Sequence, residues 1–205
     1  MKSVDKEAKT VCDQLYSEAS ILTFNWLTYK KLFVADQQQI ELLDRTGRSF
    51  FQAYHNTLLD EIFLSLNRLT DEPKPGKGAR LSLGRLLFHL AAQVDVHVRD
   101  EIRTTIDKAE KACIPFRVHR NNKLAHLNLN TALNETLNPL PEITIKQVDE
   151  ALKAIQESIT FYSNAILDES YMFEPFMAVR DATSVLFYLE KGWKCLEEHH
   201  DRIVK

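Results

Sequence analysis

Hydrophobic residues recur at steps of three and four along most of the chain, which is the period of an amphipathic α-helix. The N-terminal region, from about Val4 to Leu43, shows this period with a break or two. We predict that Gly47 stops this region and that another helix follows. The apolar positions of that helix are Phe51, Tyr54, Leu58, Ile62, Leu66 and Leu69.

Two prolines and two glycines mark the polar segment DEPKPGKGAR, residues 71–80, as a surface loop. Ser82 is the predicted N-cap of one continuous helix after this loop, about 45 Å long at 1.5 Å per residue. Pro115 is expected to end or kink that helix, where a new short helix begins. The apolar stripe of the long helix is Leu83, Leu86, Leu90, Val94, Val98, Ile102, Ile106, Ala109 and Cys113.

Two further helices are predicted toward the C-terminus. Thr144 and Gln147 have the spacing of a capping box, and apolar positions follow at helical steps as far as Ile166. After Pro175 the last helix carries an apolar seam, which we expect to pack within the same chain rather than against a second subunit. The seam consists of Val179, Ala182, Leu186, Leu189, Trp193, Leu196, His200 and Ile203.

Together these elements predict an all-α protein, an antiparallel helical bundle of four core helices with flanking N- and C-terminal helices. A length of 205 residues, 44% of them hydrophobic and 27% charged, suits one globular domain. We expect a single helical domain over residues 1–205, with flanking helices at 1–46, a core at 47–168 and a C-terminal flanking helix at 176–205.

The N-terminus, MKSVDKEAKTVCDQ, has no apolar leader region, and no stretch approaches the roughly 20 apolar residues that span a bilayer. The sequence therefore predicts a soluble cytoplasmic protein. Its three cysteines, Cys12, Cys113 and Cys195, are far apart and form no C-x-x-C pair. This spacing argues against a disulfide framework or a zinc ribbon, and we expect buried free thiols.

The formal net charge is −3, so any affinity for phosphate must come from a local patch. Such a patch is the stretch RVHRNNKLAH, residues 117–126, which lies within a segment from Lys111 to Asn134 that has no Asp or Glu. The cations of this segment are Lys111, Arg117, Arg120 and Lys123, and His119 and His126 can add two more on protonation.

The sequence lacks the motifs of metalloenzymes, nucleotide hydrolases and dinucleotide-binding enzymes. Glu197-x-x-His200 has the spacing of half a di-metal site, but no second copy exists. The chain has no H-E-x-x-H, no phosphate loop and no G-x-G-x-x-G motif, so we expect neither a metal nor another cofactor. Cys113 lies on an apolar stripe, which favours a core thiol over a nucleophile.

The residue types of RVHRNNKLAH fit RNA cleavage without a metal, in which a His acts as acid or base and an Arg stabilises the anionic phosphorus. On an ideal helix, Arg120 and His126 point about 120° apart, whereas Asn122 and His119 share a face with His126. A twofold dimer would bring two Arg and two His into one groove. The alternative is a solvated cationic face with His126 packed in the bundle.

Residues 120–126 read R-N-x4-H and resemble the signature of HEPN domains, many of which are metal-independent ribonucleases. The segments SLNRLTD, residues 65–71, and LSLGRLL, residues 81–87, look like the abortive-infection type U branch of that group. The resemblance covers about Phe50 to Leu167, the HEPN-like core. It implies that Arg120 and His126 are catalytic, that Asn121 orients the Arg, and that two motifs face each other in a homodimer.

The resemblance also implies a role in phage defence by abortive infection or in a toxin–antitoxin system, with an antitoxin or regulatory protein as a possible partner. From charge and position alone, we add Arg117, His119, Asn122 and Lys123 as RNA contacts. Leu127 and Asn128 follow His126, in place of the x-Tyr that a partner enzyme nucleotidylates in one branch. Two alternatives stay open: a noncatalytic module that binds RNA, a nucleotide or a protein, and a bundle used only for assembly.

Overall fold

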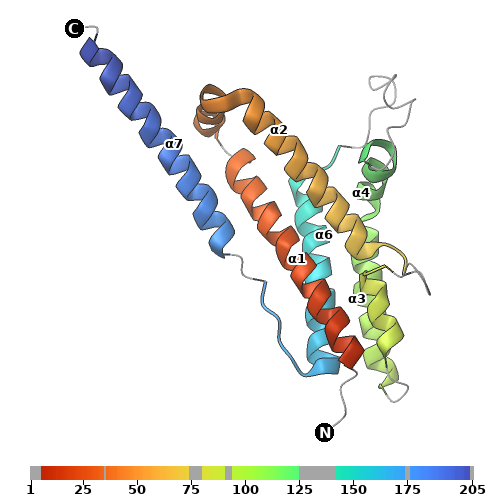
Figure 1. The fold of residues 1–205 in the computed structure, drawn as a ribbon. Helices are drawn as coiled ribbons and strands as arrows, with labels where there is room; N and C mark the ends of the chain where they lie inside the picture. The colour runs from red at the N-terminus through yellow and green to blue at the C-terminus, as the bar shows by residue number, and fades with distance from the viewer. Residues whose placement is uncertain are drawn as a thin grey trace. The chain divides into compact units, whose positions relative to one another are not determined.

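The computed structural model describes residues 6–34, 36–73, 80–90, 94–124, 142–173 and 176–203 (Figure 1). No β-strand occurs in these ranges, which confirms the predicted all-α class. The α-helices are α1 (Lys6–Phe33), α2 (Gln37–Thr70), α3 (Val96–Ala112), α4 (Ile114–His119), α6 (Ile145–Tyr162) and α7 (Phe176–Ile203). A 3-10 helix, η1 (Leu83–His89), and two π-helices, η2 (Arg120–Leu124) and η3 (Ser163–Leu167), complete the set.

The chain divides into two units, each with dense internal contacts. Unit 1 comprises Met1–Leu22 and Glu61–Phe173, and unit 2 comprises Thr23–Asp60 and Glu174–Lys205. Two of the three boundaries, after Leu22 and after Asp60, fall inside helices, so α1 and α2 contribute a segment to each unit. The expected arrangement of a core at 47–168 with flanking helices stays a prediction, because dense contacts do not show which segments fold independently.

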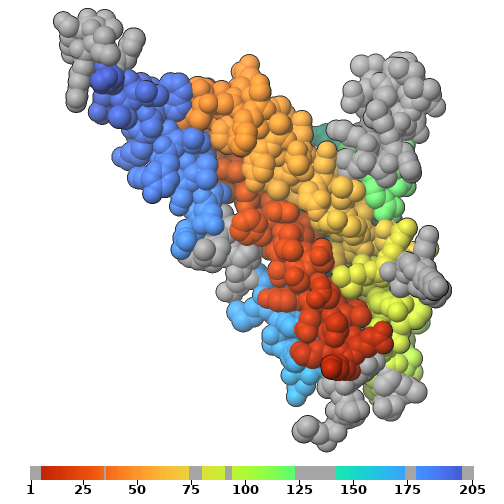
Figure 2. Space-filling model, viewed as in Figure 1, coloured from red at the N-terminus to blue at the C-terminus, as the bar shows by residue number. Residues whose placement is uncertain are grey.

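Unit 1 is a bundle whose centre is the pair α3 and α6. These helices lie side by side and run in opposite directions (Figure 1). Figure 2 shows the side chains of the N-terminal part of α1 and of the C-terminal part of α2 in contact on the face in view. The largest fully buried apolar side chains of the unit include Leu15, Leu22, Ile62, Leu66, Leu83, Leu86, Ile102, Ile106, Phe116 and Ile155.

The start of α6 is the capping box that the sequence predicts. The Thr144 hydroxyl accepts a hydrogen bond from the Gln147 backbone N–H at 3.2 Å. In return the Gln147 side-chain oxygen accepts one from the Thr144 backbone N–H at 2.8 Å. Two N–H groups that have no partner inside the helix are thereby satisfied, which confirms the predicted helix start.

The prediction of one continuous helix from Leu83 to Cys113 is wrong. The segment forms η1 first, and α3 begins only at Val96, where the Asp95 carboxylate accepts from the His97 backbone N–H at 2.7 Å. Asp95 therefore acts as an N-cap and starts a new helix. The apolar stripe did not reveal this interruption, because its steps of three and four continue on both sides of it.

Ser82 precedes η1, but the predicted cap hydrogen bond is absent. Its Oγ is buried and has no hydrogen-bond partner among the described residues. At Gly84 the backbone of η1 lies close to the Pro73 ring. A Cβ added at this glycine would lie 2.8 Å from Pro73 Cδ. η1 thus packs directly on Pro73 of the predicted loop, residues 74–79 of which lie outside the described part.

Unit 2 contains the N-terminal part of α2 and all of α7. Gly47 has non-helical dihedral angles inside α2 and produces a kink instead of the predicted stop. On α7, Ala182 is buried, and the Trp193 indole N–H donates to the Thr46 hydroxyl at 2.8 Å. Part of the predicted seam therefore packs within the chain, whereas Leu196 is exposed.

The thiol prediction is right at two positions and wrong at one. Cys12 and Cys113 are buried and free, but Cys195 is exposed on α7. The adjacent seam residue Leu196 is exposed as well, so this part of α7 is not covered by the described residues. In the part of the chain that the structure describes, no helix is long and apolar enough to cross a membrane.

Candidate active site

The segment that carries the R-N-x4-H motif begins with α4, which is anchored to α2. Pro115 occupies the first turn of α4, where a proline costs no hydrogen bond. Phe116 is fully buried, and its ring centroid lies 5.2 Å from that of Phe63. The buried Asn67 amide donates to the backbone oxygens of Phe63 at 2.6 Å and Phe116 at 3.1 Å. These contacts fix α4 against the end of α2.

α4 continues into the π-helix η2, so the ideal-helix angle does not describe the motif. A π-helix bonds residue i to i+5 and has a wider turn than an α-helix. The 120° separation that we derived for Arg120 and His126 is therefore not valid for this backbone. His126 lies outside the described residues, as does the side chain of Lys123.

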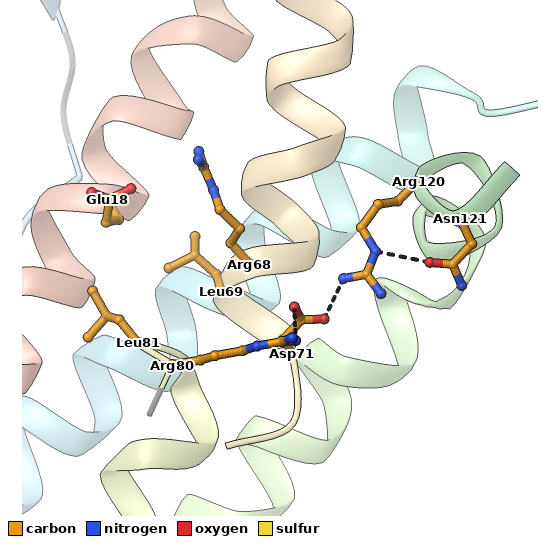
Figure 3. A pocket seen from close by; sticks show the side chains of 8 residues that line it. All are labelled: Glu18, Arg68, Leu69, Asp71, Arg80, Leu81, Arg120 and Asn121. Atoms are coloured by element: carbon orange, nitrogen blue, oxygen red, sulfur yellow. Dashed lines mark hydrogen bonds and ion pairs between the residues drawn. The ribbon is translucent and has the colours of Figure 1, made fainter. Parts of the chain in front are cut away.

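Arg120 is held by a carboxylate from another element. Its Nη1 lies 2.5 Å from Asp71 Oδ1, and its Nε donates to Asn121 Oδ1 at 3.2 Å (Figure 3). The other oxygen of Asp71 accepts from Arg80 Nη1 at 3.0 Å. The side chains of Arg120 and Asp71 are only 23% and 14% exposed, which limits screening by water. The Arg120 guanidinium is thus oriented before any ligand arrives.

This ion pair forms part of the wall of a pocket of about 730 Å³. Such a volume falls within the range of small-molecule sites. The charged groups among the described lining residues are three guanidinium groups and two carboxylates, and Leu69 and Leu81 supply apolar surface. The lining residues, shown in Figure 3, are Glu18, Arg68, Leu69, Asp71, Arg80, Leu81, Arg120 and Asn121.

Three of the predicted RNA contacts engage other parts of the protein. Arg117 Nη2 donates to the backbone oxygen of Thr70 at 2.6 Å, which satisfies a carbonyl at the end of α2. The His119 ring meets the Phe63 ring at 5.5 Å and 67°. Asn122 donates to Val118 O at 2.8 Å. Among the predicted site residues whose side chains the structure describes, Arg120 and Asn121 alone lie in the wall of the pocket.

Burial is the main cause of the pKa shifts of Cys113 and Glu110, which precede the motif in the sequence. It raises the pKa of the Cys113 thiol to about 11, and the thiol is fully buried. Burial also raises the pKa of the Glu110 carboxyl, whereas the positive charge of Arg117 lowers it. A neutral, inaccessible thiol is not a nucleophile, which agrees with the prediction that Cys113 belongs to the core.

Four charged residues of the pocket were not among the predicted site residues: Glu18, Arg68, Asp71 and Arg80. A signal for two of them was present, because Arg68 and Asp71 belong to the segment SLNRLTD that carries the family resemblance. Nothing local marked Glu18 or Arg80, which come from α1 and from the residues before η1. Among the described residues, no group of three or more His, Cys, Asp or Glu could hold a metal ion.

The described helices form an all-α bundle of the HEPN type, and the R-N-x4-H segment begins at Arg120 in the wall of the charged pocket. The family model described as AbiU2 matches residues 5–183, so the chain belongs to the AbiU2 family of HEPN domains. No curated protein and no solved structure matches the chain.

Proposed function

We propose that the protein is a metal-independent endoribonuclease of the HEPN type. The observation that carries this proposal is the fixed guanidinium of Arg120, held by Asp71 and Asn121 in the wall of a pocket. A cation placed before the reaction stabilises the charge that develops on the phosphorus at little reorganisation cost. The motif supplies the second group, His126, as the acid or base.

In the proposed reaction, a base removes the proton of the ribose 2′-hydroxyl, and the 2′-oxygen attacks the adjacent phosphorus. The P–O5′ bond breaks, and an acid protonates the leaving 5′-oxygen. The products are a 2′,3′-cyclic phosphate and a 5′-hydroxyl. Each chain has one motif His, so a homodimer with facing motifs would provide one His126 as base and the other as acid.

Family membership also supports a proposal for the biological setting. The AbiU2 family supports a role in abortive infection, with cleavage of RNA in the cytoplasm as the toxic act. We extend this to a toxin–antitoxin system in which an antitoxin or another regulatory protein restrains the activity. Asn122, Lys123, His119 and Arg117 stay proposals as RNA contacts.

The test is incubation of the purified protein with labelled RNA in excess EDTA. Wild type should cleave, and Arg120→Ala and His126→Ala should each lose on the order of 10² to 10³ in rate. Arg103→Ala is the matched control, because Arg103 is an exposed arginine of the same unit and does not line the pocket. Circular dichroism verifies that each variant is folded.

Cleavage by either motif variant at the wild-type rate would refute the proposal. Salt-sensitive retention of RNA without cleavage would favour the noncatalytic binding module. If the protein neither cleaves nor binds RNA, the remaining alternative is a helical bundle that serves only in assembly.

A further inference from the structure

The pocket at Arg120 has two chemically different ends. Arg120 and Asn121 form one end, and Glu18 from α1 forms the other, with Arg68 between them in the view of Figure 3. All lining residues belong to unit 1. A ligand that fills this pocket therefore meets a cation at one end and a carboxylate at the other.

Glu18 is the unexplained part of this lining. Its side chain is half-buried, and among the described residues it has no hydrogen bond or ion pair. Asp71, by contrast, has a partner at each carboxylate oxygen, because one oxygen accepts from Arg120 and the other from Arg80. A carboxylate is an acceptor only, so Glu18 can bind just those ligand groups that donate hydrogen bonds.

The remaining lining fits the other parts of a nucleotide. Leu81 exposes apolar surface beside the buried Leu69, which suits the face of a base. Arg68 donates to Glu61 Oε1 at 2.5 Å and to Ser65 Oγ at 2.8 Å through Nη2. A guanidinium has five N–H donors in total, so others stay available for a phosphate oxygen.

We infer that Glu18 reads a guanine base next to the phosphate that Arg120 contacts. Guanine is the base whose Watson–Crick edge offers two adjacent donors, N1–H and N2–H, which match the two oxygens of a carboxylate. Adenine places an acceptor at N1, and cytosine and uracil each offer one donor beside acceptors. Single-stranded RNA exposes these edges to a protein. The inference rests on the proposed function, because that function supplies RNA as the ligand.

The test is binding of labelled oligouridine strands that carry one guanine, inosine or adenine, measured by fluorescence anisotropy. The strands have 2′-deoxy sugars, which lack the attacking hydroxyl, so cleavage cannot interfere. Wild type should bind the guanine strand about tenfold to a hundredfold more tightly than the adenine strand. Inosine, which lacks the N2 amino group, should fall between them.

Glu18→Gln should abolish the preference for guanine, because an amide presents a donor in place of one acceptor. The control Glu101→Gln removes the same charge at an exposed site of α3 and should keep the preference. Equal affinity for all strands, undetectable binding, or an unchanged preference in Glu18→Gln would overturn the inference.

The outcome is separable from that of the cleavage assay. Cleavage that depends on Arg120, without a preference that depends on Glu18, would retain the ribonuclease and reject the guanine site. A preference that depends on Glu18, without cleavage, would retain the site in a noncatalytic module.

Discussion

Arg120 and Asp71 are 49 residues apart in the sequence, yet Nη1 of the arginine lies 2.5 Å from Oδ1 of the aspartate. The pair joins the start of η2 to the end of α2. Because Asp71 also accepts from Arg80, one carboxylate positions two guanidinium groups. The orientation of the motif arginine therefore depends on a residue outside the motif.

Replacing Asp71 should slow the proposed cleavage while sparing RNA affinity. In Asp71→Asn, Arg120 loses its charged partner, and misplacement of a reacting group by about 1 Å can cost roughly 10² in rate. The variant also removes a negative charge from the pocket, so RNA should bind as tightly as to wild type or more tightly. Single-turnover rates and anisotropy titrations separate the two effects.

Arg80→Ala is the control for this experiment, because it leaves the Arg120–Asp71 ion pair in place. Its effect on the rate should be smaller than that of Asp71→Asn. A parallel fall in rate, RNA affinity and melting temperature in Asp71→Asn would instead indicate a purely structural role.

Arg117 should contribute to the stability of the fold, whether or not it also contacts RNA. Arg117→Ala removes the 2.6 Å hydrogen bond to Thr70 O, and Thr70 is fully buried. Loss of a hydrogen bond to a charged group costs about 1.5–3 kcal/mol of unfolding free energy. Urea denaturation followed by circular dichroism measures this loss, with Arg103→Ala as the exposed control. Wild-type stability of Arg117→Ala would contradict the stabilising role, and if RNA binding were then weaker and less salt-dependent, Arg117 would act as an RNA contact alone.

Two glycines should respond to alanine in opposite directions. In Gly84→Ala the new Cβ would lie 2.8 Å from the Pro73 ring, so we expect a loss of about 1–3 kcal/mol in stability. In Gly192→Ala nothing lies within 4 Å, and the residue is exposed within α7. There alanine should stabilise by about 0.5–1 kcal/mol, because it restricts the unfolded chain. Denaturation curves of both variants measure the two changes in unfolding free energy. Equal changes in the two variants would contradict the packing of η1 on Pro73.

The three thiols should differ in reactivity. Burial raises the pKa of Cys12 to about 12 and that of Cys113 to about 11, so both stay protonated near neutral pH. Cys195 is exposed. A thiol-reactive reagent at a pH of about 8 should therefore modify Cys195 alone in the native protein. Mass spectrometry of the labelled peptides identifies the site, and labelling in guanidinium chloride should reach all three. Rapid native labelling of Cys113 would contradict its place in the core.

Much of the fold was predictable, because its signals are local. The capping box at Thr144 and the proline at the start of α4 each act within one turn of helix. The prediction of one long helix after Ser82 was wrong because it also relied on a local signal, the apolar period. The apolar period continues past Asp95 without a change of step. The N-cap contact between Asp95 and His97 that starts α3 does not alter this period, so the period alone does not reveal the new helix.

The sequence by itself determined the all-α class and the place of the R-N-x4-H motif, since the hydrophobic period and a short motif are properties of neighbouring residues. Only the tertiary structure decided which groups meet. Asp71 reaches Arg120, Arg117 reaches Thr70, and Glu18 shares a pocket with Arg68. These pairings join segments that are distant along the chain, and they depend on how the helices pack, which no local pattern encodes.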